Sequence, residues 1–368
     1  METTELRRIA RQLNLPGFGM AQAGRLADAR VLVVGAGGLG CPAMQSLAAV
    51  GLGNIRLYDD DTVDLSNIHR QILFGTDDVG RRKVDAAADR LRQLQPGIAV
   101  EAVHARLTPD NILAALDRVD LVLDGSDTFA TKYLVADAAE LTGTPLIWGT
   151  VLRYAGQVAL WHSGPGVSGG VGLRDLFPEQ PAADSTPDCA TAGVLGVTTS
   201  VVGNLMATEA VKYLTGLGES VPGRVYSYEA LGTSLRSFNV GADPARTPVP
   251  GLEGFYGAGA CATPPVTEPN PEARRVLGLV RAGRARALDV REVHEKVLAD
   301  LPVEAAGLHL PMSEVSAGRV TELLGEVDGP VVVYCASGVR SARFIEEHAG
   351  RVPVELINLP GGVNGLVG

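Results

Sequence analysis

Residues 31–40, VLVVGAGGLG, join an apolar run to glycines spaced as G-x-G-x-x-G. Because glycine has no Cβ atom, such a turn lets backbone N–H groups and the start of the following helix approach a phosphate closely. Asp59 ends the next apolar run, where its carboxylate can accept hydrogen bonds from ribose hydroxyls. The pattern therefore predicts a nucleotide site. Its expected contacts on the turn are Gly35, Gly37, Gly38 and Gly40.

Charged residues around this turn indicate ATP in place of a nicotinamide dinucleotide. When a carboxylate attacks ATP, an anion meets a polyanion, so the site needs cations and a metal ion near the phosphates. Arg11, Arg70 and Lys83 can supply the positive charge. Asp127 follows the apolar run DLVLD, at the strand end where an open α/β sheet places ligand groups, and is the candidate for binding Mg²⁺.

Simpler interpretations of these residues stay open at this stage. Arg70 and Lys83 could be solvated charges on helix faces, with packed aliphatic stems and hydrated ends. Asp127 could cap a helix that starts at Thr128, a role compatible with metal binding. A nicotinamide-dependent oxidoreductase would account for the glycines and Asp59. It leaves unexplained Arg11, Asn67, Arg70, Lys83 and Asp127.

Several spaced motifs together resemble the MoeB/ThiF family of sulfur-carrier adenylyltransferases, relatives of the ubiquitin-activating enzymes. The motifs are RQ at 11–12, DDDTVDLSNIHRQ at 59–71, VGRRK at 79–83 and DGSD at 124–127. The likeness covers roughly residues 5–240. It implies ATP and Mg²⁺ as cofactors, Asn67 as a phosphate or ribose contact, and a homodimer in which Arg11 reaches the partner subunit's ATP.

The same resemblance implies the reaction and the partner. The C-terminal carboxylate of a small ubiquitin-like sulfur-carrier protein, ending in Gly-Gly, is adenylated and then receives sulfur, in molybdopterin, thiamine or a related sulfur pathway. A scaffold that binds such a carrier without turnover is the non-enzymatic alternative. The sequence does not identify the carrier or the sulfur donor.

Cys189 lies in the glycine-bearing segment TPDCATAGVLG, residues 186–196. The family carries a cysteine in this loop, linked there to acyl or persulfide chemistry, whereas a buried inert thiol is the alternative. Many members also bind a structural zinc through two C-x-x-C pairs. Here the first pair aligns with Gly172 and Asp175, and no second pair follows Tyr228. We therefore expect no zinc site and a loop held by packing alone.

Cys335 ends the apolar run VVVYC, and a tight loop to Arg340 follows it. The segment resembles the active-site loop of a rhodanese. Backbone N–H groups, a helix N-terminus and the guanidinium would favour the thiolate, the form that carries a sulfane sulfur. Ala336 stands where many relatives carry lysine. A degenerate structural or docking module is therefore the alternative to active sulfur transfer.

The remaining cysteines carry weaker signals. Cys41 is expected to fill space in the first turn of a helix, and Cys261 lies among glycines and alanines with nothing nearby to lower its pKa. The four cysteines are far apart and form no C-x-x-C pair, so neither a disulfide framework nor a four-thiolate zinc site is expected.

The elements that must position these residues follow from the pattern along the chain. From Ala29, short β-branched runs alternate with helical stretches, which predicts a doubly wound, Rossmann-like parallel sheet of the α/β class. After Gly149, the segment VLRYAGQVALWH has no crossover helix behind it, and residues 198–214 form a long apolar helical pattern. The C-terminal part of the sheet is therefore expected to be mixed.

A change of composition predicts where the domains divide. Residues 1–240 form the expected ATP-binding adenylyltransferase domain. Residues 241–271 are rich in proline and glycine and are expected to be a linker. Residues 272–368 contain short strands separated by helical pieces, which predicts a small α/β rhodanese-like domain.

The net charge of −10 argues against general affinity for nucleic acid or for an acidic membrane, because both require clustered cations. No apolar stretch is long enough to span a bilayer, and the N-terminal residues lack the apolar core of a secretion signal. The cytoplasm is the expected compartment.

Overall fold

The computed structural model describes residues 3–181, 193–254, 256, 271–298, 301 and 307–366. The chain divides into two compact units, Met1–Ala262 and Thr263–Gly368. Each unit contains its own β-sheet and its own hydrophobic cores. Within the described residues, no helix combines the length and the apolar character needed to cross a membrane.

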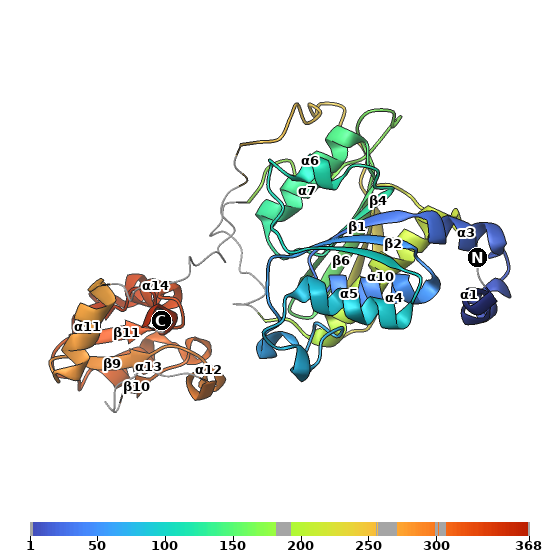
Figure 1. Cartoon of the computed structure of the whole chain (residues 1–368). Helices are drawn as coiled ribbons and strands as arrows, with labels where there is room; N and C mark the ends of the chain where they lie inside the picture. The colour runs from blue at the N-terminus through green and yellow to red at the C-terminus, as the bar shows by residue number, and fades with distance from the viewer. Residues whose placement is uncertain are drawn as a thin grey trace. The chain divides into compact units, whose positions relative to one another are not determined.

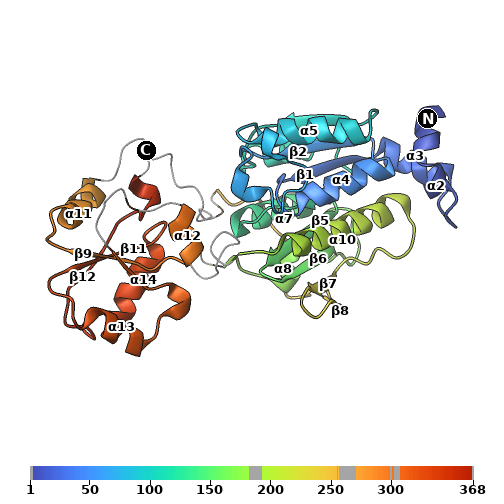
Figure 2. The same cartoon turned by 90° about the horizontal axis from the view of Figure 1, so that it is seen from below.

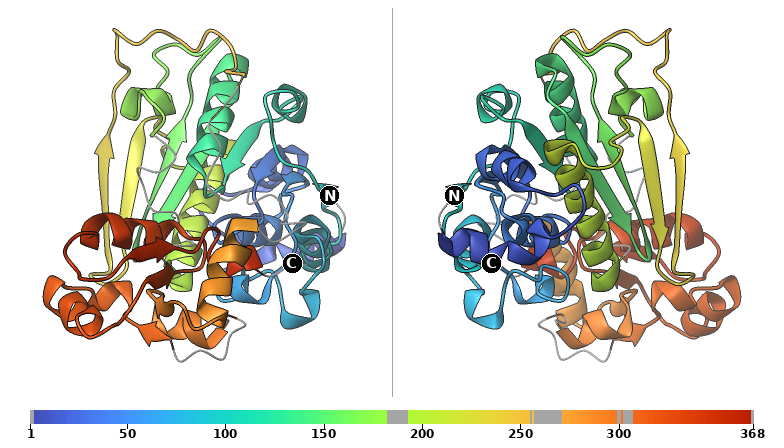
Figure 3. Two further views of the ribbon diagram at one scale, coloured as in Figure 1. Left: turned by 90° about the vertical axis from the view of Figure 1, so that its left-hand side faces the viewer. Right: turned by 90° about the vertical axis from the view of Figure 1, so that its right-hand side faces the viewer.

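An eight-stranded sheet forms the centre of the first unit (Figure 1). The strands are β1 Arg30–Val34, β2 Asn54–Tyr58, β3 Ala99–Val103, β4 Leu121–Asp124, β5 Leu146–Leu152, β6 Ala155–Trp161, β7 Arg224–Glu229 and β8 Ser234–Asn239. Their order is β3-β2-β1-β4-β5-β6-β7-β8, parallel up to β5 and antiparallel from β5 onward. Figure 3 shows β7 and β8, in yellow, at the outer edge. The predicted Rossmann-like sheet with a mixed C-terminal part is confirmed.

Helices cover both faces of this sheet. Alternate residues of β1 point to opposite faces: Val31 and Val33 pack with α4, α5 and α10, whereas Leu32 and Val34 pack with α6 and α7. The helix bounds are α4 Gly40–Val50, α5 Lys83–Leu94, α6 Ile112–Ala115, α7 Phe129–Thr142, α8 Leu173–Leu176 and α10 Gly196–Thr215. Figure 2 shows α4 and α10 side by side. Because α10 is apolar over most of its length, the helix predicted for 198–214 is confirmed.

The strand order reverses at β1, which lies between β2 and β4. At such a point the connections leave the sheet toward opposite faces, so a crevice opens beyond the carboxyl ends of the strands. Three short N-terminal helices, α1 Thr3–Arg8, α2 Ala10–Leu13 and α3 Met20–Asp28, precede β1. They share a small separate core with the end of α10.

Part of the expected linker is held firmly by the first unit. Arg246 donates to Glu140 and to Asp175, each at 2.9 Å. Further along, the Tyr256 hydroxyl donates to Asp137 at 2.7 Å. The expectation that packing alone holds the region of Gly172 and Asp175 is therefore wrong, because buried ion pairs join it to the residues after 240.

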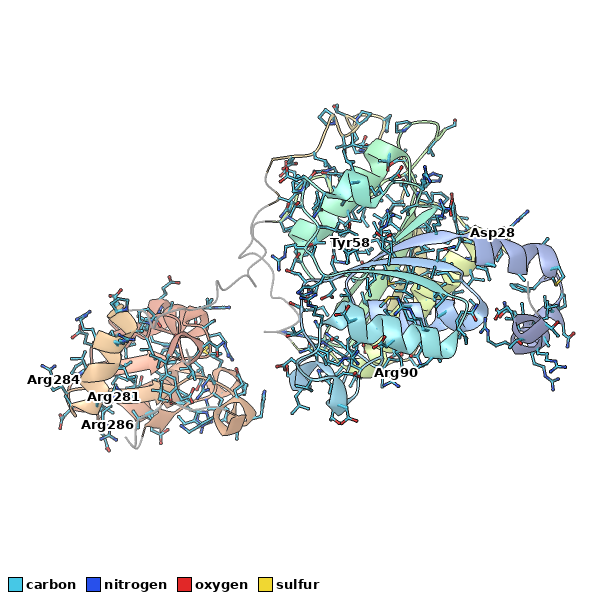
Figure 4. The ribbon with its side chains drawn as sticks, viewed as in Figure 1. Asp28, Tyr58, Arg90, Arg281, Arg284 and Arg286 are labelled. Carbon is cyan, nitrogen blue, oxygen red and sulfur yellow. The ribbon has the colours of Figure 1, made fainter. Side chains whose placement is uncertain are left out.

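The second unit contains a four-stranded parallel sheet in the order β10-β9-β11-β12. Its strands are β9 Arg286–Asp289, β10 Leu308–His309, β11 Val331–Tyr334 and β12 Leu356–Asn358, and its helices are α11 Pro271–Arg281, α12 Val293–Leu298, α13 Ala317–Leu324 and α14 Val339–His348. One face packs with α11, and the other packs with α13 and α14. Three arginines labelled in Figure 4 mark this region: Arg281 ends α11, Arg284 lies in the connection that follows, and Arg286 begins β9.

Candidate functional site

A cavity of about 320 Å³ lies beyond the carboxyl ends of β1, β2 and β4, at the reversal point of the sheet. Tyr58, labelled in Figure 4, ends β2 and lines this cavity. The predicted residues that line it are Gly35, Gly37, Gly38, Asp59, Asn67, Arg70, Lys83 and Asp127. The structure therefore brings together eight of the residues that the sequence singled out for ATP.

The glycine turn approaches its neighbours too closely for side chains. Gly35 has a φ of +88°, a backbone conformation that residues with a Cβ rarely adopt. A Cβ atom at Gly40 would lie 1.9 Å from the carbonyl oxygen of Gly35. Gly40 does not line the cavity, and it lets helix α4 begin directly behind the turn. Gly37 and Gly38 line the open side, where a phosphate can approach backbone N–H groups.

Asp59 is fixed between the glycine turn and its own loop. One carboxylate oxygen accepts from the Ala36 N–H at 2.7 Å, and the other accepts from the Asp61 N–H at 2.8 Å. Burial raises the pKa of Asp59, although Lys83 and these N–H groups oppose the shift. Each carboxylate oxygen can accept more than one hydrogen bond, so Asp59 can still receive ribose hydroxyls.

Lys83 is a buried cation and begins helix α5. Its side chain is only 5% exposed, and its ammonium lies 2.8 Å from a carboxylate oxygen of Asp61. The interpretation of Lys83 as a solvated helix-face charge is therefore wrong. Asp61 holds the ammonium at the cavity wall.

Arg70 and Asn67 lie on the loop that follows β2. The Arg70 guanidinium donates to the Ser66 carbonyl at 3.2 Å and lies 2.8 Å from a ring nitrogen of His69. The Asn67 amide oxygen accepts from Gln71 at 2.7 Å. Arg70 is half-buried, and its contacts are to uncharged groups, so it keeps its positive charge for a ligand in the cavity.

Asp127 is exposed and lines the cavity just beyond β4. The Thr128 hydroxyl accepts from the Thr131 N–H at 3.2 Å, which makes Thr128 the cap of helix α7. The capping interpretation of Asp127 is therefore wrong. In the part of the chain that the structure describes, its carboxylate has no hydrogen-bond or ion-pair partner. A single free carboxylate facing a phosphate site suits Mg²⁺, which commonly binds one or two carboxylates plus phosphate oxygens and water.

Arg106 is a cavity residue that sequence reasoning missed. Its guanidinium lies 3.1 Å from Asp60, and both side chains line the cavity. Asn111 holds this loop by donating to the Arg106 carbonyl at 2.9 Å and accepting from the Thr108 N–H at 2.8 Å. The sequence did contain a signal for Arg106: it directly follows the run IAVEAVHA, and that strand ends at the same edge of the sheet as the cavity.

Arg11 is exposed on α2 and does not line the cavity of its own chain. Cys189 and Cys261 lie outside the described residues. Cys41 is fully buried, its thiol contacts the Ala36 carbonyl at 3.3 Å, and burial raises the pKa of Cys41 to about 12. Cys41 thus fills space as predicted.

The second unit places Cys335 at the carboxyl end of β11, inside the loop that leads to α14. Its sulfur accepts from the Gly338 N–H at 3.1 Å and lies 3.5 Å from the Ser341 hydroxyl. Burial acts to raise the pKa of Cys335, but hydrogen bonds from Ser341, Ser337 and Gly338 together lower it. A lower pKa increases the fraction of Cys335 that is thiolate, the nucleophilic form.

Arg340 has a partner that the sequence did not reveal. Its guanidinium binds both carboxylate oxygens of Glu295, at 2.5 and 2.7 Å. The expected direct support of the Cys335 thiolate by this guanidinium is therefore secondary, and the hydroxyl and backbone N–H groups supply the main stabilisation.

Comparison with known proteins agrees with this geometry. Residues 9–249 match the ThiF family. This chain belongs to the ThiF family. "Probable adenylyltransferase/sulfurtransferase MoeZ" of Mycobacterium tuberculosis is 39% identical over 365 residues, which cover 98% of this chain and 92% of that protein. "Sulfur carrier protein adenylyltransferase" of Thermus thermophilus is 47% identical over 68% of this chain and 92% of its own length.

The match extends to animals and to solved structures. "Adenylyltransferase and sulfurtransferase MOCS3" of Bos taurus is 35% identical over 99% of this chain and 85% of that protein. The crystal structure of E. coli MccB shares the fold, with a TM-score of 0.56 and 20% identity over 69% of this chain and 75% of that one. Since MoeZ and MOCS3 both match across the two units, the predicted resemblance is confirmed for the chain as a whole.

Proposed function

We propose that this ThiF-family protein uses ATP to adenylate the C-terminal carboxylate of a ubiquitin-like sulfur-carrier protein ending in Gly-Gly, and then replaces the adenylate with sulfur. One observation carries the proposal. A single cavity combines the glycine turn, the buried cation Lys83, Arg70 and the unpartnered carboxylate of Asp127. The relatives named for adenylation and sulfur transfer support it.

Adenylation follows from the groups around the cavity. Asp59 accepts the ribose hydroxyls, and the N–H groups beside Gly37 and Gly38 receive phosphate oxygens. A carboxylate oxygen of the carrier attacks the α-phosphorus, the bond to the bridging oxygen breaks, and pyrophosphate leaves. Arg70 and Lys83 stabilise the charge that develops on the phosphates, and Lys83 must exchange Asp61 for a phosphate oxygen to do so.

Mg²⁺, when bound, neutralises phosphate charge and orients the leaving pyrophosphate. Asp127 would hold it, as its free and exposed carboxylate allows. Arg11 is exposed on α2 and is proposed to reach the ATP of a second copy of the chain in a homodimer.

Cys335 is the proposed sulfur carrier. Its thiolate takes a sulfane sulfur from a donor and becomes a persulfide, whose terminal sulfur then attacks the acyl carbon and expels AMP. A second thiol must next attack the Cys335 sulfur to release the carrier thiocarboxylate, and Cys189 is the candidate for that step.

The test is ATP–pyrophosphate exchange with purified carriers. Exchange should appear when a carrier ending in Gly-Gly is added, and should be absent with the same carrier lacking its last glycine. Equal exchange without any carrier would show that the substrate class is wrong. Carrier binding without pyrophosphate release would indicate a scaffold, and tight binding of NAD would favour the oxidoreductase alternative.

A further inference from the structure

Lys132 is a buried cation beneath the nucleotide cavity. It lies in the first turns of α7 and is 3% exposed. Its ammonium donates to the carbonyl oxygen of Gly149 at 2.6 Å and lies 3.5 Å from a carboxylate oxygen of Asp124. Lys132 does not line the cavity, so it acts on a ligand there only through other residues.

Asp124 connects this cation to the turn that carries Asp127. The Asp124 side chain is fully buried at the end of β4. Its other oxygen accepts from the Ser126 N–H at 2.9 Å and from the Ser126 hydroxyl at 2.5 Å. These two bonds close a side-chain turn over residues 124–126, directly before Asp127, and so restrict the direction in which the backbone enters Asp127.

The turn also contacts the phosphate-binding loop. The Gly125 N–H donates to the Val34 carbonyl at 2.9 Å, and a Cβ atom at Gly125 would lie 3.0 Å from the backbone nitrogen of Gly40. The hydrogen bond from Lys132 to Gly149 fixes the middle of β5 as well, and the next residue, Thr150, lines the cavity. One buried ammonium therefore joins two cavity walls.

The buried carboxylate of Asp124 depends on the charge of Lys132. Among the residues that the structure describes, the buried Asp124 oxygen that faces Lys132 has no hydrogen-bond partner. A buried carboxylate that loses its cation is strongly destabilised even when one of its oxygens keeps hydrogen bonds, so removing the ammonium would force the Asp124 side chain and its turn to rearrange. Two well-packed apolar side chains could fill the same space without any need for a cation to balance a carboxylate.

We propose that Lys132 is a positioning residue for the nucleotide site: through Asp124 and Ser126 it orients the carboxylate of Asp127 toward the metal-bound phosphates of ATP. This inference rests on the proposed function, because it assigns Lys132 to the Mg²⁺-dependent part of nucleotide binding. Residues that orient a metal ligand typically change metal affinity or activity by roughly tenfold to a hundredfold when they are replaced.

The test compares two substitutions that each remove a cation from a buried carboxylate, one at Lys132 of α7 and one at Arg174 of α8. Lys132→Met removes the ammonium but keeps the length of the side chain. The control, Arg174→Met, breaks the buried pair between Arg174 and Asp137 of α7, which lies at 2.7 Å and does not line the cavity. ATP binding is measured by calorimetry with Mg²⁺ and with EDTA, beside the melting temperature of each variant.

Lys132→Met should weaken Mg²⁺-dependent ATP binding by about tenfold or more while leaving binding in EDTA near the wild-type value, and Lys132→Arg should restore part of the loss. Arg174→Met should lower only the melting temperature. If Lys132→Met does not fold, the double variant Lys132→Met/Asp124→Asn removes both charges of the buried pair and allows the same comparison. Wild-type Mg²⁺ dependence in either variant would overturn the positioning role. Absence of ATP binding by the wild-type protein would instead contradict the proposed function itself.

Discussion

The ammonium of Lys83 lies 2.8 Å from a carboxylate oxygen of Asp61, although Asp61 is largely exposed and Lys83 is buried. The pair lines the nucleotide cavity, so a bound phosphate and Asp61 compete for the same cation. Asp61 thereby holds the Lys83 ammonium at the cavity wall before ATP arrives.

Asp61→Asn should tighten ATP binding modestly, by no more than about fivefold, because an ion pair with one exposed partner contributes at most about 1 kcal/mol. Lys83→Met should weaken ATP binding and exchange strongly, since it removes a cation from the phosphates. Calorimetric titration with ATP distinguishes the two effects. If Asp61→Asn weakened binding as much as Lys83→Met, Asp61 would be a direct ligand of the nucleotide and not a competitor.

Asp127→Ala should abolish most pyrophosphate exchange without changing the free energy of unfolding. The carboxylate is exposed and has no partner among the described residues, so its loss removes no folded-state contact. Thr128→Ala is the matched control: loss of this cap should destabilise the protein by about 1 kcal/mol and leave exchange largely intact. Pyrophosphate exchange and thermal melting are measured for both variants. Near-normal exchange in Asp127→Ala would show that Asp127 has no role in adenylation.

The part of this site that sequence reasoning could predict is the part that depends on short segments. The glycine turn, Asp59 and Asp127 each follow an apolar strand, and parallel strands bring their carboxyl ends to one edge. Lys132 could not be found in this way, because its role comes from contacts with Asp124 and Gly149 that only the packed helix and sheet create.

The need for packed contacts also explains why the sequence did not predict two ion pairs. The pairing of Arg340 with Glu295 joins residues 45 positions apart, and that of Arg246 with Glu140 joins residues 106 positions apart. Neither partner is marked by a local pattern. The proline- and glycine-rich composition after residue 240 predicts a linker, but composition does not show that Arg246 and Tyr256 attach its first part to the first unit.

Arg246→Ala should destabilise the protein by about 3 kcal/mol at neutral pH, because Glu140 and Asp175 would remain buried without their cation. Burial acts to raise the pKa of Glu140, but Arg246 and further hydrogen bonds lower it overall. A lowered pKa stabilises the fold above the ordinary pKa of the group, and this contribution is lost as the pH falls through the folded-state value. The difference between wild type and variant should therefore shrink in acid.

Chemical denaturation of wild type and Arg246→Ala between pH 7 and pH 3 measures that trend.

The purified protein should contain no stoichiometric zinc, because Gly172 and Asp175 cannot replace two thiolates. EDTA should leave its melting temperature unchanged. One zinc ion per chain in elemental analysis would contradict the replacement of a metal site by the ion pairs of Arg246.

Ser341→Ala should raise the pKa of Cys335, because the Ser341 hydroxyl lies 3.5 Å from the sulfur and helps to lower that pKa. The pH profile of iodoacetamide modification at Cys335, followed by mass spectrometry, should then move to higher pH. Ser337→Ala is the control, since Ser337 contributes through its backbone and should leave the profile in place. An unmoved profile in Ser341→Ala would assign the lowered pKa to the backbone N–H groups alone.

The two proposed chemistries should separate when single cysteines are replaced. Adenylation needs Lys83, Arg70 and Asp127, which all line the cavity of the first unit. Sulfuration needs a nucleophile that can first be loaded with sulfur, and Cys335 has the lowered pKa and the hydrogen-bond donors for it. Cys335→Ala should therefore preserve pyrophosphate exchange and abolish both thiosulfate sulfurtransferase activity and formation of the carrier thiocarboxylate with thiosulfate.

Mass spectrometry of the carrier measures this outcome as the replacement of one oxygen atom by sulfur, with free sulfide excluded. Cys189→Ala is the comparison. If the Cys189 thiol acts only after attack on the adenylate, its loss should leave formation of the Cys335 persulfide unchanged and slow release of the thiocarboxylate. A covalent acyl disulfide between the carrier and Cys335 that accumulates in this variant would place Cys189 after attack on the adenylate, whereas accumulation of free persulfide would place it at that attack. If Cys335→Ala still produced thiocarboxylate from thiosulfate at the wild-type rate, the second unit would not be the source of the sulfur, and its role would be reduced to structure or docking.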